Sequence, residues 1–188
     1  MRKLIGGMAF AAIVLSLPAA AMAQRRTTAP MSTAKHELGV DIGVAYVKPN
    51  GVSGGIAIVT PFDVRFGLVP RRGKMMWEPR VTLNFNTTGG NTTYLFTPGI
   101  NMLYSNTPGG HRRGMYFTGG AGLVMGDGGA GGSGTAFQLN GGVGWRKPYE
   151  GAAWRYELGF QWVSQSAELG PFADYIAIGG RIGISLWH

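Results

Sequence analysis

The feature that most constrains this chain is a strict alternation of bulky apolar residues with small or polar ones. Between Glu37 and Tyr46, every second residue is bulky and apolar, and the residues between them are small or acidic. This period of two predicts a β-strand, because successive side chains of a strand point to opposite faces. The pattern recurs along the chain until eight segments are counted, so we expect eight strands.

Residues that favour turns separate the eight segments. They lie at Pro49–Gly51, Pro70–Lys74, Thr88–Asn91, Pro108–Gly110, Gly126–Gly134, Lys147–Pro148 and Glu168–Pro171. Connections of this kind join neighbouring strands as antiparallel hairpins. The sequence therefore predicts an all-β fold with up-and-down topology.

The charged residues within the eight segments share one face with the glycines, and we place none of them on the bulky apolar face. The ten are Glu37, Asp41, Asp63, Arg65, Glu78, Arg80, Arg146, Arg155, Glu157 and Arg181. The interior of an eight-stranded barrel is only wide enough to be filled by side chains, so the many bulky apolar residues have to point outward. An outward apolar band matches the core of a bilayer but not water. The sequence thus predicts a closed eight-stranded antiparallel transmembrane β-barrel.

The ten inward charges comprise five acidic and five basic side chains. We expect them to form ion pairs that fill the lumen and hold neighbouring strands in register. A filled lumen predicts a structural or interaction protein of the cell envelope. The transport alternative is a narrow, porin-like ion or small-solute channel along Glu78, Arg80, Arg155, Glu157 and Arg181.

Aromatic residues gather near both ends of the predicted strands, as the girdles of membrane barrels do. One set comprises Trp77, Tyr104, Tyr116, Trp145, Trp154 and Trp187, and the other comprises Tyr46, Tyr94, Trp162 and Tyr175. With the N-terminus on the periplasmic side, the periplasmic connections form a basic rim of Arg71, Arg72, Lys74, Arg112, Arg113 and Lys147. We expect the rim to meet anionic phospholipid headgroups, and a solvated rim without a ligand is the alternative.

The first residues have the organisation of a cleavable signal peptide. A positive start precedes the apolar stretch Leu4–Leu17, and Ala21 and Ala23 form a small-residue cleavage site. We expect cleavage after Ala23, so that residues 1–23 are the signal peptide, residues 24–35 a flexible segment and residues 36–188 the barrel. The apolar stretch is shorter than the roughly 20 residues that span a bilayer, which makes a membrane-anchoring helix the weaker alternative.

Composition and charge exclude several other classes of protein. The chain has no cysteine, so neither a disulfide framework nor a thiolate metal site is available. Loss of two basic residues with the signal peptide lowers the formal net charge from +8 to +6. Nucleic acid is one partner for such a charge, but the placement of the basic residues favours a membrane, so we expect no nucleic-acid binding.

The leader, the eight alternating segments, the turns and the final strand resemble the small outer-membrane barrels of the OmpA transmembrane-domain and OmpX type. The resemblance implies export through the secretory pathway, integral location in the outer membrane, contact with outer-membrane lipids and folding by the barrel-assembly machinery. Members usually end in an aromatic residue in phase with the outward side chains of the last strand, a feature that this machinery reads. Here Ile182, Ile184 and Leu186 keep that phase, His188 occupies the terminal position and Trp187 is one residue out of step. We expect a monomer.

Some barrels that resemble this chain modify lipid A or phospholipids, which is the enzyme alternative. Nucleophilic hydrolysis needs a serine, a histidine base and an orienting acid within hydrogen-bond reach. The histidines His36, His111 and His188 have no serine in phase on the same strand, and no histidine and carboxylate cluster has metal-ligand spacing. We therefore predict no catalytic residue, no metal and no cofactor.

Overall fold

The structure is a closed antiparallel barrel of eight strands joined in chain order, as the sequence predicts. It is a computed structural model that describes residues 35–51, 53–68, 73–88, 91–106, 112–127, 133–149, 152–170 and 173–187. The predicted signal peptide, its cleavage site at Ala21 and Ala23, nearly all of the segment 24–35, and His188 lie outside the described residues. No helix among the described residues is long and apolar enough to cross a membrane.

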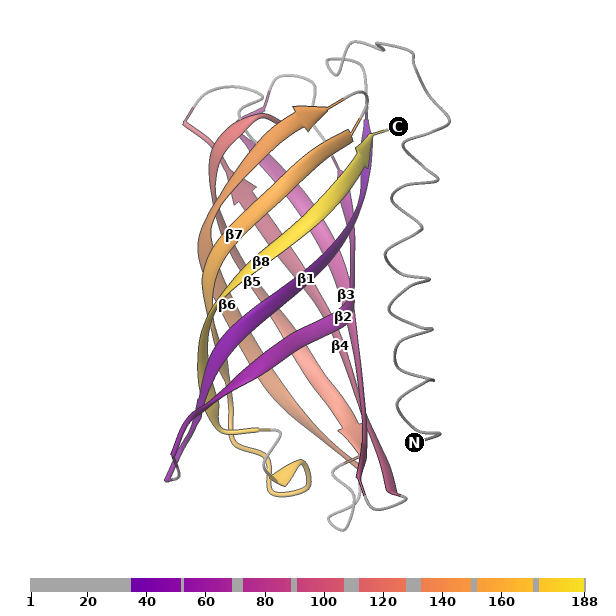
Figure 1. The fold of residues 1–188 in the computed structure, drawn as a ribbon, viewed down its shortest axis with the longest axis vertical. Coiled ribbons are helices and arrows are strands. Elements are labelled where there is room, and N and C mark those ends of the chain that lie inside the picture. The colour runs from indigo at the N-terminus through magenta and orange to yellow at the C-terminus, as the bar shows by residue number, and fades with distance from the viewer. Residues whose placement is uncertain are drawn as a thin grey trace, which may run out of the picture.

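The strands follow one another around the barrel, each hydrogen-bonded to the next (Figure 1). They are β1 (His36–Pro49), β2 (Gly55–Leu68), β3 (Met75–Thr88), β4 (Asn91–Tyr104), β5 (Gly114–Asp127), β6 (Ser133–Tyr149), β7 (Ala152–Val163) and β8 (Tyr175–Trp187). Their lengths of 12 to 17 residues exceed the about 9–11 residues that a tilted strand needs to cross a bilayer. The strands therefore extend beyond the apolar band at their ends.

The barrel closes between its first and last strands. β1 pairs with β8 along its whole length, from Glu37 opposite Trp187 to Pro49 opposite Tyr175. Because the number of strands is even, β1 begins and β8 ends at the same end of the barrel, which is at the top of Figure 1. We call this the terminal end, and we call the opposite end, with the β1–β2 and β7–β8 connections, the far end.

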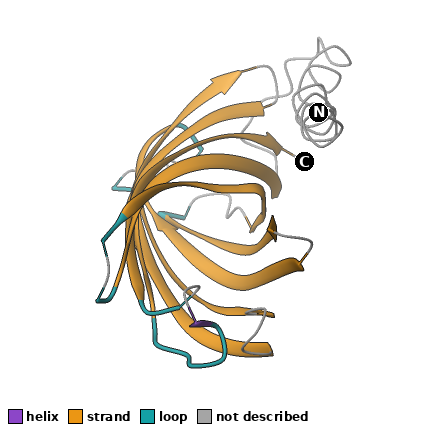
Figure 2. Cartoon of the chain, turned by 60° about the horizontal axis from the view of Figure 1, so that its bottom comes forward, coloured by secondary structure: helices purple, strands orange, loops and turns teal. Residues whose placement is uncertain are grey.

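The pairing of β2 with β3 is shorter than the closure. Among the described residues, the printed partners run from Phe62 opposite Leu83 to Leu68 opposite Trp77, in the half of the barrel nearer the terminal end. Pro61 lies next to the pair of Phe62 and Leu83, and proline has no backbone N–H to donate to a neighbouring strand. The two strands diverge from this point toward the far end (Figures 1 and 2).

The outer face of the barrel is apolar, as predicted. Large apolar side chains of every strand are exposed on it, including Leu158 (60% exposed), Ile178 (59%) and Trp145 (54%). The strands are longer than the alternation indicated, which corrects the expectation that no charged strand residue lies on the apolar face. Lys48 and Lys147 lie on the outward face, but at the strand ends, at the level expected for lipid headgroups.

The aromatic girdles are smaller than predicted. Trp77, Tyr104 and Trp145 are exposed near the terminal end, and Tyr46, Tyr94 and Trp162 are exposed near the far end. Three aromatic residues assigned to the girdles belong to the inward phase of their strands instead: Tyr116, Trp187 and Tyr175. Tyr116 is fully buried and Trp187 is only 9% exposed.

Candidate functional site

The ten charged side chains predicted to line the lumen form one continuous ion-pair network. Each of them lies within 4.0 Å of at least one opposite charge. They come from six strands, β1, β2, β3, β6, β7 and β8. Nine of the ten are at least nine-tenths buried at the side chain, and the exception, Arg181, is 16% exposed. The structure thus brings every one of these predicted residues together.

Glu78 is the centre of the network and is fully buried. Arg155 donates to both oxygens of this carboxylate, with Nη1–Oε2 and Nη2–Oε1 distances of 2.6 and 3.2 Å. Arg65 donates from β2 at 3.1 Å, and Arg146 donates from β6 at 3.5 Å. One carboxylate therefore ties three arginines from three strands, which stabilises the charged form of each group in the absence of bulk water.

Two other carboxylates extend the network along the lumen. Glu37 accepts from Arg146 at 2.6 Å and from Arg155 at 3.4 Å, nearer the terminal end. Asp63 accepts from Arg80 at 2.7 Å and lies 3.6 Å from Arg181, nearer the middle of the barrel. The two remaining acids, Asp41 and Glu157, are also paired with arginine, since both lie within ion-pair distance of Arg65.

Glycines on the inward face make room for these long side chains. A Cβ atom at Gly183 would overlap the Asp41 carboxylate, and one at Gly144 would overlap the Tyr116 ring. The mixture of glycine and charge on one face, first seen as a sequence pattern, thus has a packing explanation. Both glycines are the direct partners of these residues on the adjacent strand, so each large side chain lies over a position that has no side chain of its own.

Arginine and aromatic side chains alternate in a stack at the terminal end. The Arg112 and Arg146 guanidinium carbons lie 5.8 and 5.4 Å from the centre of the Trp187 ring. The Arg146 and Arg155 carbons lie 5.3 and 5.9 Å from the centre of the Tyr116 ring. The Tyr116 hydroxyl also donates to Glu157 at 3.3 Å. This cation–π stack extends the ion-pair network toward the terminal end.

The roles of Tyr116, Trp187 and Arg112 were not predicted from the sequence. The alternation itself carried a signal for two of them, because Tyr116 shares the phase of the glycines in β5 and Trp187 is out of step with the outward residues of β8. Arg112 precedes β5, so no strand phase could place its side chain.

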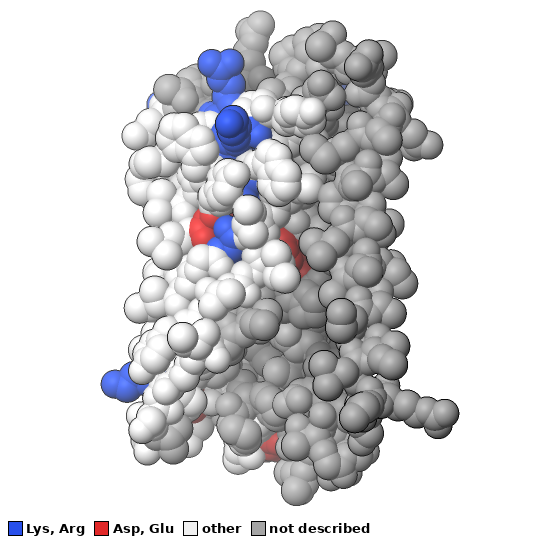
Figure 3. All heavy atoms as spheres, in the orientation of Figure 1, with Lys and Arg blue, Asp and Glu red and all other residues white. Residues whose placement is uncertain are grey.

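The basic rim is therefore only partly as predicted. Lys74, Arg113 and Lys147 are exposed near the terminal end, and Arg71 and Arg72 lie outside the described residues. Arg112 departs from the prediction, because its side chain is 6% exposed and stacks on Trp187. Burial lowers the pKa of Arg112, and the Glu37 carboxylate opposes that shift. Figure 3 shows basic side chains at the top of the molecule and opposite charges together near mid-height.

An apolar cluster lies in the far half of the lumen. Leu169 and Ala173, from the connection between β7 and β8, pack against Val124, Ala136 and Val163 of the wall. All five are nearly inaccessible to solvent. The β7–β8 connection therefore packs back against the inner wall of β5, β6 and β7 at the far end.

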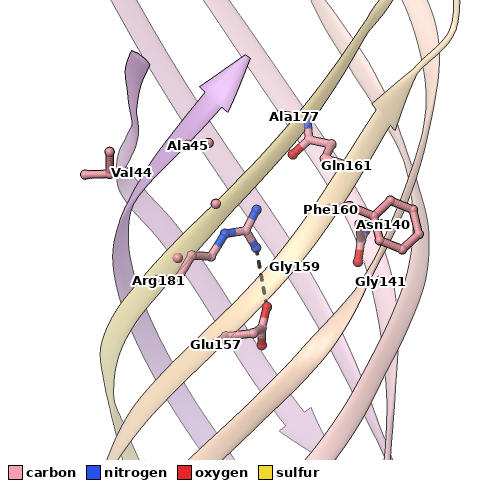
Figure 4. A pocket seen from close by; sticks show the side chains of 12 residues that line it. Val44, Ala45, Asn140, Gly141, Glu157, Gly159, Phe160, Gln161, Ala177 and Arg181 are labelled. Carbon is pink, nitrogen blue, oxygen red and sulfur yellow. Dashed lines mark ion pairs between the residues drawn. The ribbon is translucent and has the colours of Figure 1, made fainter. Parts of the chain in front are cut away.

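A cavity of about 30 Å³ lies between the two halves of the lumen. Glu157 and Arg181 point toward one another on its wall, and Gln161, Asn140 and Ala177 complete its polar and small lining (Figure 4). This volume holds about two water molecules. Within the described residues, no group of three histidine, aspartate or glutamate side chains could hold a metal ion.

Comparison with known proteins identifies the fold. No protein-family model matches the chain, and no curated protein matches its sequence. Among solved structures, Neisserial surface protein A (NspA) aligns with a TM-score of 0.53 and 12% identity over 82% of this chain and 98% of that chain. Ail, the attachment invasion locus protein of Yersinia pestis, aligns with a TM-score of 0.49 and 8% identity over 82% and 99% of the two chains.

The chain has the fold of the small eight-stranded outer-membrane barrels. The alignment with NspA, at a TM-score of 0.53, spans nearly all of that protein and most of this chain. The predicted fold class and the resemblance to OmpA- and OmpX-type barrels are thereby confirmed at the level of architecture. An identity of 12% carries the fold and no more, because one barrel fold serves many unrelated functions.

Proposed function

We propose that this protein is an integral outer-membrane barrel with a closed lumen and a structural or interaction role in the cell envelope. One observation carries the proposal, namely the separation of charge from apolar surface across the wall. Ten charged side chains lie in one network inside, while the outward positions between the strand ends are apolar.

The outer face supports the location. A continuous exposed apolar belt would be a very large unfavourable surface in water, whereas acyl chains solvate it. Closure of the barrel satisfies backbone hydrogen bonds internally, as a membrane requires. Export through the secretory pathway, folding by the assembly machinery and a monomeric state are parts of the same proposal.

The lumen supports a closed barrel over the channel alternative. The cation–π stack, the Glu78 network and the apolar cluster around Leu169 lie in series along the barrel, and the cavity between them has room for only about two water molecules. Within the described residues, this arrangement favours a closed lumen over an ion path.

The proposal assigns no reaction to the protein. His36 stacks on Phe66 with a ring-centre distance of 5.6 Å, which favours a packing role for it. His111 and His188 lie outside the described residues. Lipid modification would be detected as acyl-chain release from outer-membrane lipid by the purified protein.

Two measurements test the proposal. We expect the protein to fractionate with the outer membrane and to migrate faster on a gel before boiling than after, because a folded barrel resists detergent. Recovery in the soluble periplasm, or a band unchanged by boiling, would refute the membrane barrel.

The closed lumen has a separate test. Purified protein in a planar bilayer should give no steady conductance, and sustained currents would refute the plug while leaving the location intact. N-terminal sequencing of exported protein checks the signal peptide, since a retained Met1 would exclude cleavage after Ala23.

A further inference from the structure

Three outward side chains form a row across β1, β8 and β7 near the far end. Lys48 lies opposite Ile176, and Ile176 lies opposite Trp162 on its other side. All three are exposed, with Trp162 39% and Ile176 52% accessible. The row therefore presents a cation, an aliphatic side chain and an indole side by side on the outer surface.

The row forms the floor of an open groove of about 950 Å³. The β1–β2 turn and the residues before β8 form its walls, and the further lining residues are Pro49, Asn50, Gly51, Ser53, Asp174 and Tyr175. The groove thus lies where the apolar belt ends and the polar connections begin.

Hydrogen bonds hold the walls of the groove in place. The Asn50 N–H donates to the Asp174 carbonyl at 2.9 Å, and the Asp174 N–H donates to the Ser164 carbonyl at 3.1 Å. Asp174 has a φ of 55°, in the left-handed region. Aspartate tolerates this conformation better than most other residues, and it suits a turn. The two hydrogen bonds therefore connect the walls of the groove to each other and to the end of β7.

The chemistry of the groove changes from apolar to polar along the barrel axis. Trp162 and Ile176 continue the belt toward Phe160 and Ile178, which are 53% and 59% exposed. On the other side lie the polar groups of the turn and the Lys48 ammonium. An amphiphile fits this change, with acyl chains along the belt and a head group in the groove.

The side chains also restrict the kind of head group. An exposed indole face stacks on a flat or ring-shaped partner, the Lys48 ammonium attracts an anionic oxygen, and Asn50, Ser53 and Asp174 offer donors and acceptors for hydroxyl groups. A phosphate group by itself offers only the anionic oxygens that Lys48 attracts. A phosphorylated sugar adds a ring for the indole and hydroxyl groups that can donate to the Asp174 carboxylate.

We propose that the groove binds the head group of a phosphorylated glycolipid in the outer leaflet. Trp162 stacks on a sugar ring, Lys48 binds a phosphate and the acyl chains lie along Ile176 and Ile178. This inference rests on the proposed function, which directs the far end of the barrel to the outside of the membrane.

The same strands supply a matched control at the other end. Trp154 of β7 lies opposite Ile184 on one side and opposite the exposed Lys147 of β6 on the other, so this row carries the same three kinds of side chain without lining the groove. Both tryptophans lie on the outward face of β7, eight positions apart. If both tryptophans only anchor the barrel in the membrane interface, substitution of Trp154 and of Trp162 should have the same effect on lipid binding.

The experiment titrates purified, folded full-length protein in detergent with three probes and follows bound lipid by native mass spectrometry. The probes are bisphosphorylated lipid A, its dephosphorylated form and phosphatidylglycerol. Trp162→Ala and Lys48→Ala should each weaken lipid A binding about tenfold, whereas Trp154→Ala and Lys147→Ala should leave it unchanged. Lys48→Ala should cause no loss with the dephosphorylated probe.

Equal loss from Trp154→Ala and Trp162→Ala would overturn the site, because binding would then reflect the girdles in general. Equal affinity for phosphatidylglycerol would overturn the sugar specificity. If Trp162→Ala loses its heat-modifiable band, that variant does not fold. Lys48→Ala, at an exposed strand end, then tests the binding site by itself. Since the titration uses purified protein, its failure is separate from the fractionation result.

Discussion

The two halves of the lumen are filled by different kinds of side chain. In the half near the terminal end, acids and arginines cross from wall to wall and stack on Tyr116 and Trp187. In the far half, Leu169 from a connection packs into an apolar cluster of the wall, beside a hydrogen bond from Gln161 to Tyr175. The charged network is built by strands alone, whereas a connection contributes to the apolar cluster.

The difference has consequences for how each half responds to change. Buried charges depend on every partner, so the loss of one acid leaves several uncompensated cations. An apolar cluster loses only the contacts and the volume of the group removed. The charged half should therefore be the more sensitive of the two, and the following variants test that ranking.

The largest effect is expected from Glu78→Ala. It would leave Arg65, Arg146 and Arg155 without their shared partner in a buried position, which should lower the free energy of unfolding by about 3–5 kcal/mol. Urea unfolding in detergent measures the change, with exposed Arg113→Ala as the control. A smaller loss of unfolding free energy than that of Leu169→Ala would reverse the ranking.

Trp187→Ala should be nearly as harmful, although the residue lies at the end of the last strand. Its ring separates the Arg112 and Arg146 guanidinium groups, and removal of a buried indole costs about 3 kcal/mol. The temperature at which the compact gel band disappears should fall. Trp187→Phe should recover much of that loss in temperature. A phenylalanine variant as unstable as Trp187→Ala would argue against a role in stacking.

Leu169→Ala tests the far half directly. The side chain is fully buried against Val124, Ala136 and Val163, so we expect a loss of about 2 kcal/mol. Glu168→Ala, the exposed neighbour in the same connection, should have no measurable effect on unfolding. Conductance should stay absent in both variants, because the Glu78 network still closes the lumen, and a current in Leu169→Ala would show that the loop is the main barrier.

The smallest effect is expected from Tyr175→Phe. The substitution removes only the hydroxyl that accepts from Gln161 Nε2 at 2.8 Å, which should cost about 1 kcal/mol. The change is measured in the same urea series. A loss as large as that of Glu78→Ala would mean that polar contacts matter equally in both halves.

The sequence by itself determined the architecture and the face of each strand. Alternation with period two assigns every side chain to one of two faces, and the narrow interior of eight strands leaves only the outside for the bulky set. The ten charged residues were therefore placed in the lumen without knowledge of any contact. The order of the strands followed from the turns between them.

Only the tertiary structure decided which side chains meet. Glu37 and Arg146 are 109 positions apart, and their contact depends on the register of every hairpin between them and on the closure of β1 with β8. Residues outside the alternation had no assigned face, so Arg112 and Leu169 could not be placed. The alternation specifies whether each side chain points inward or outward. Which residue it meets across the lumen is decided only when the strands are in register and the barrel is closed.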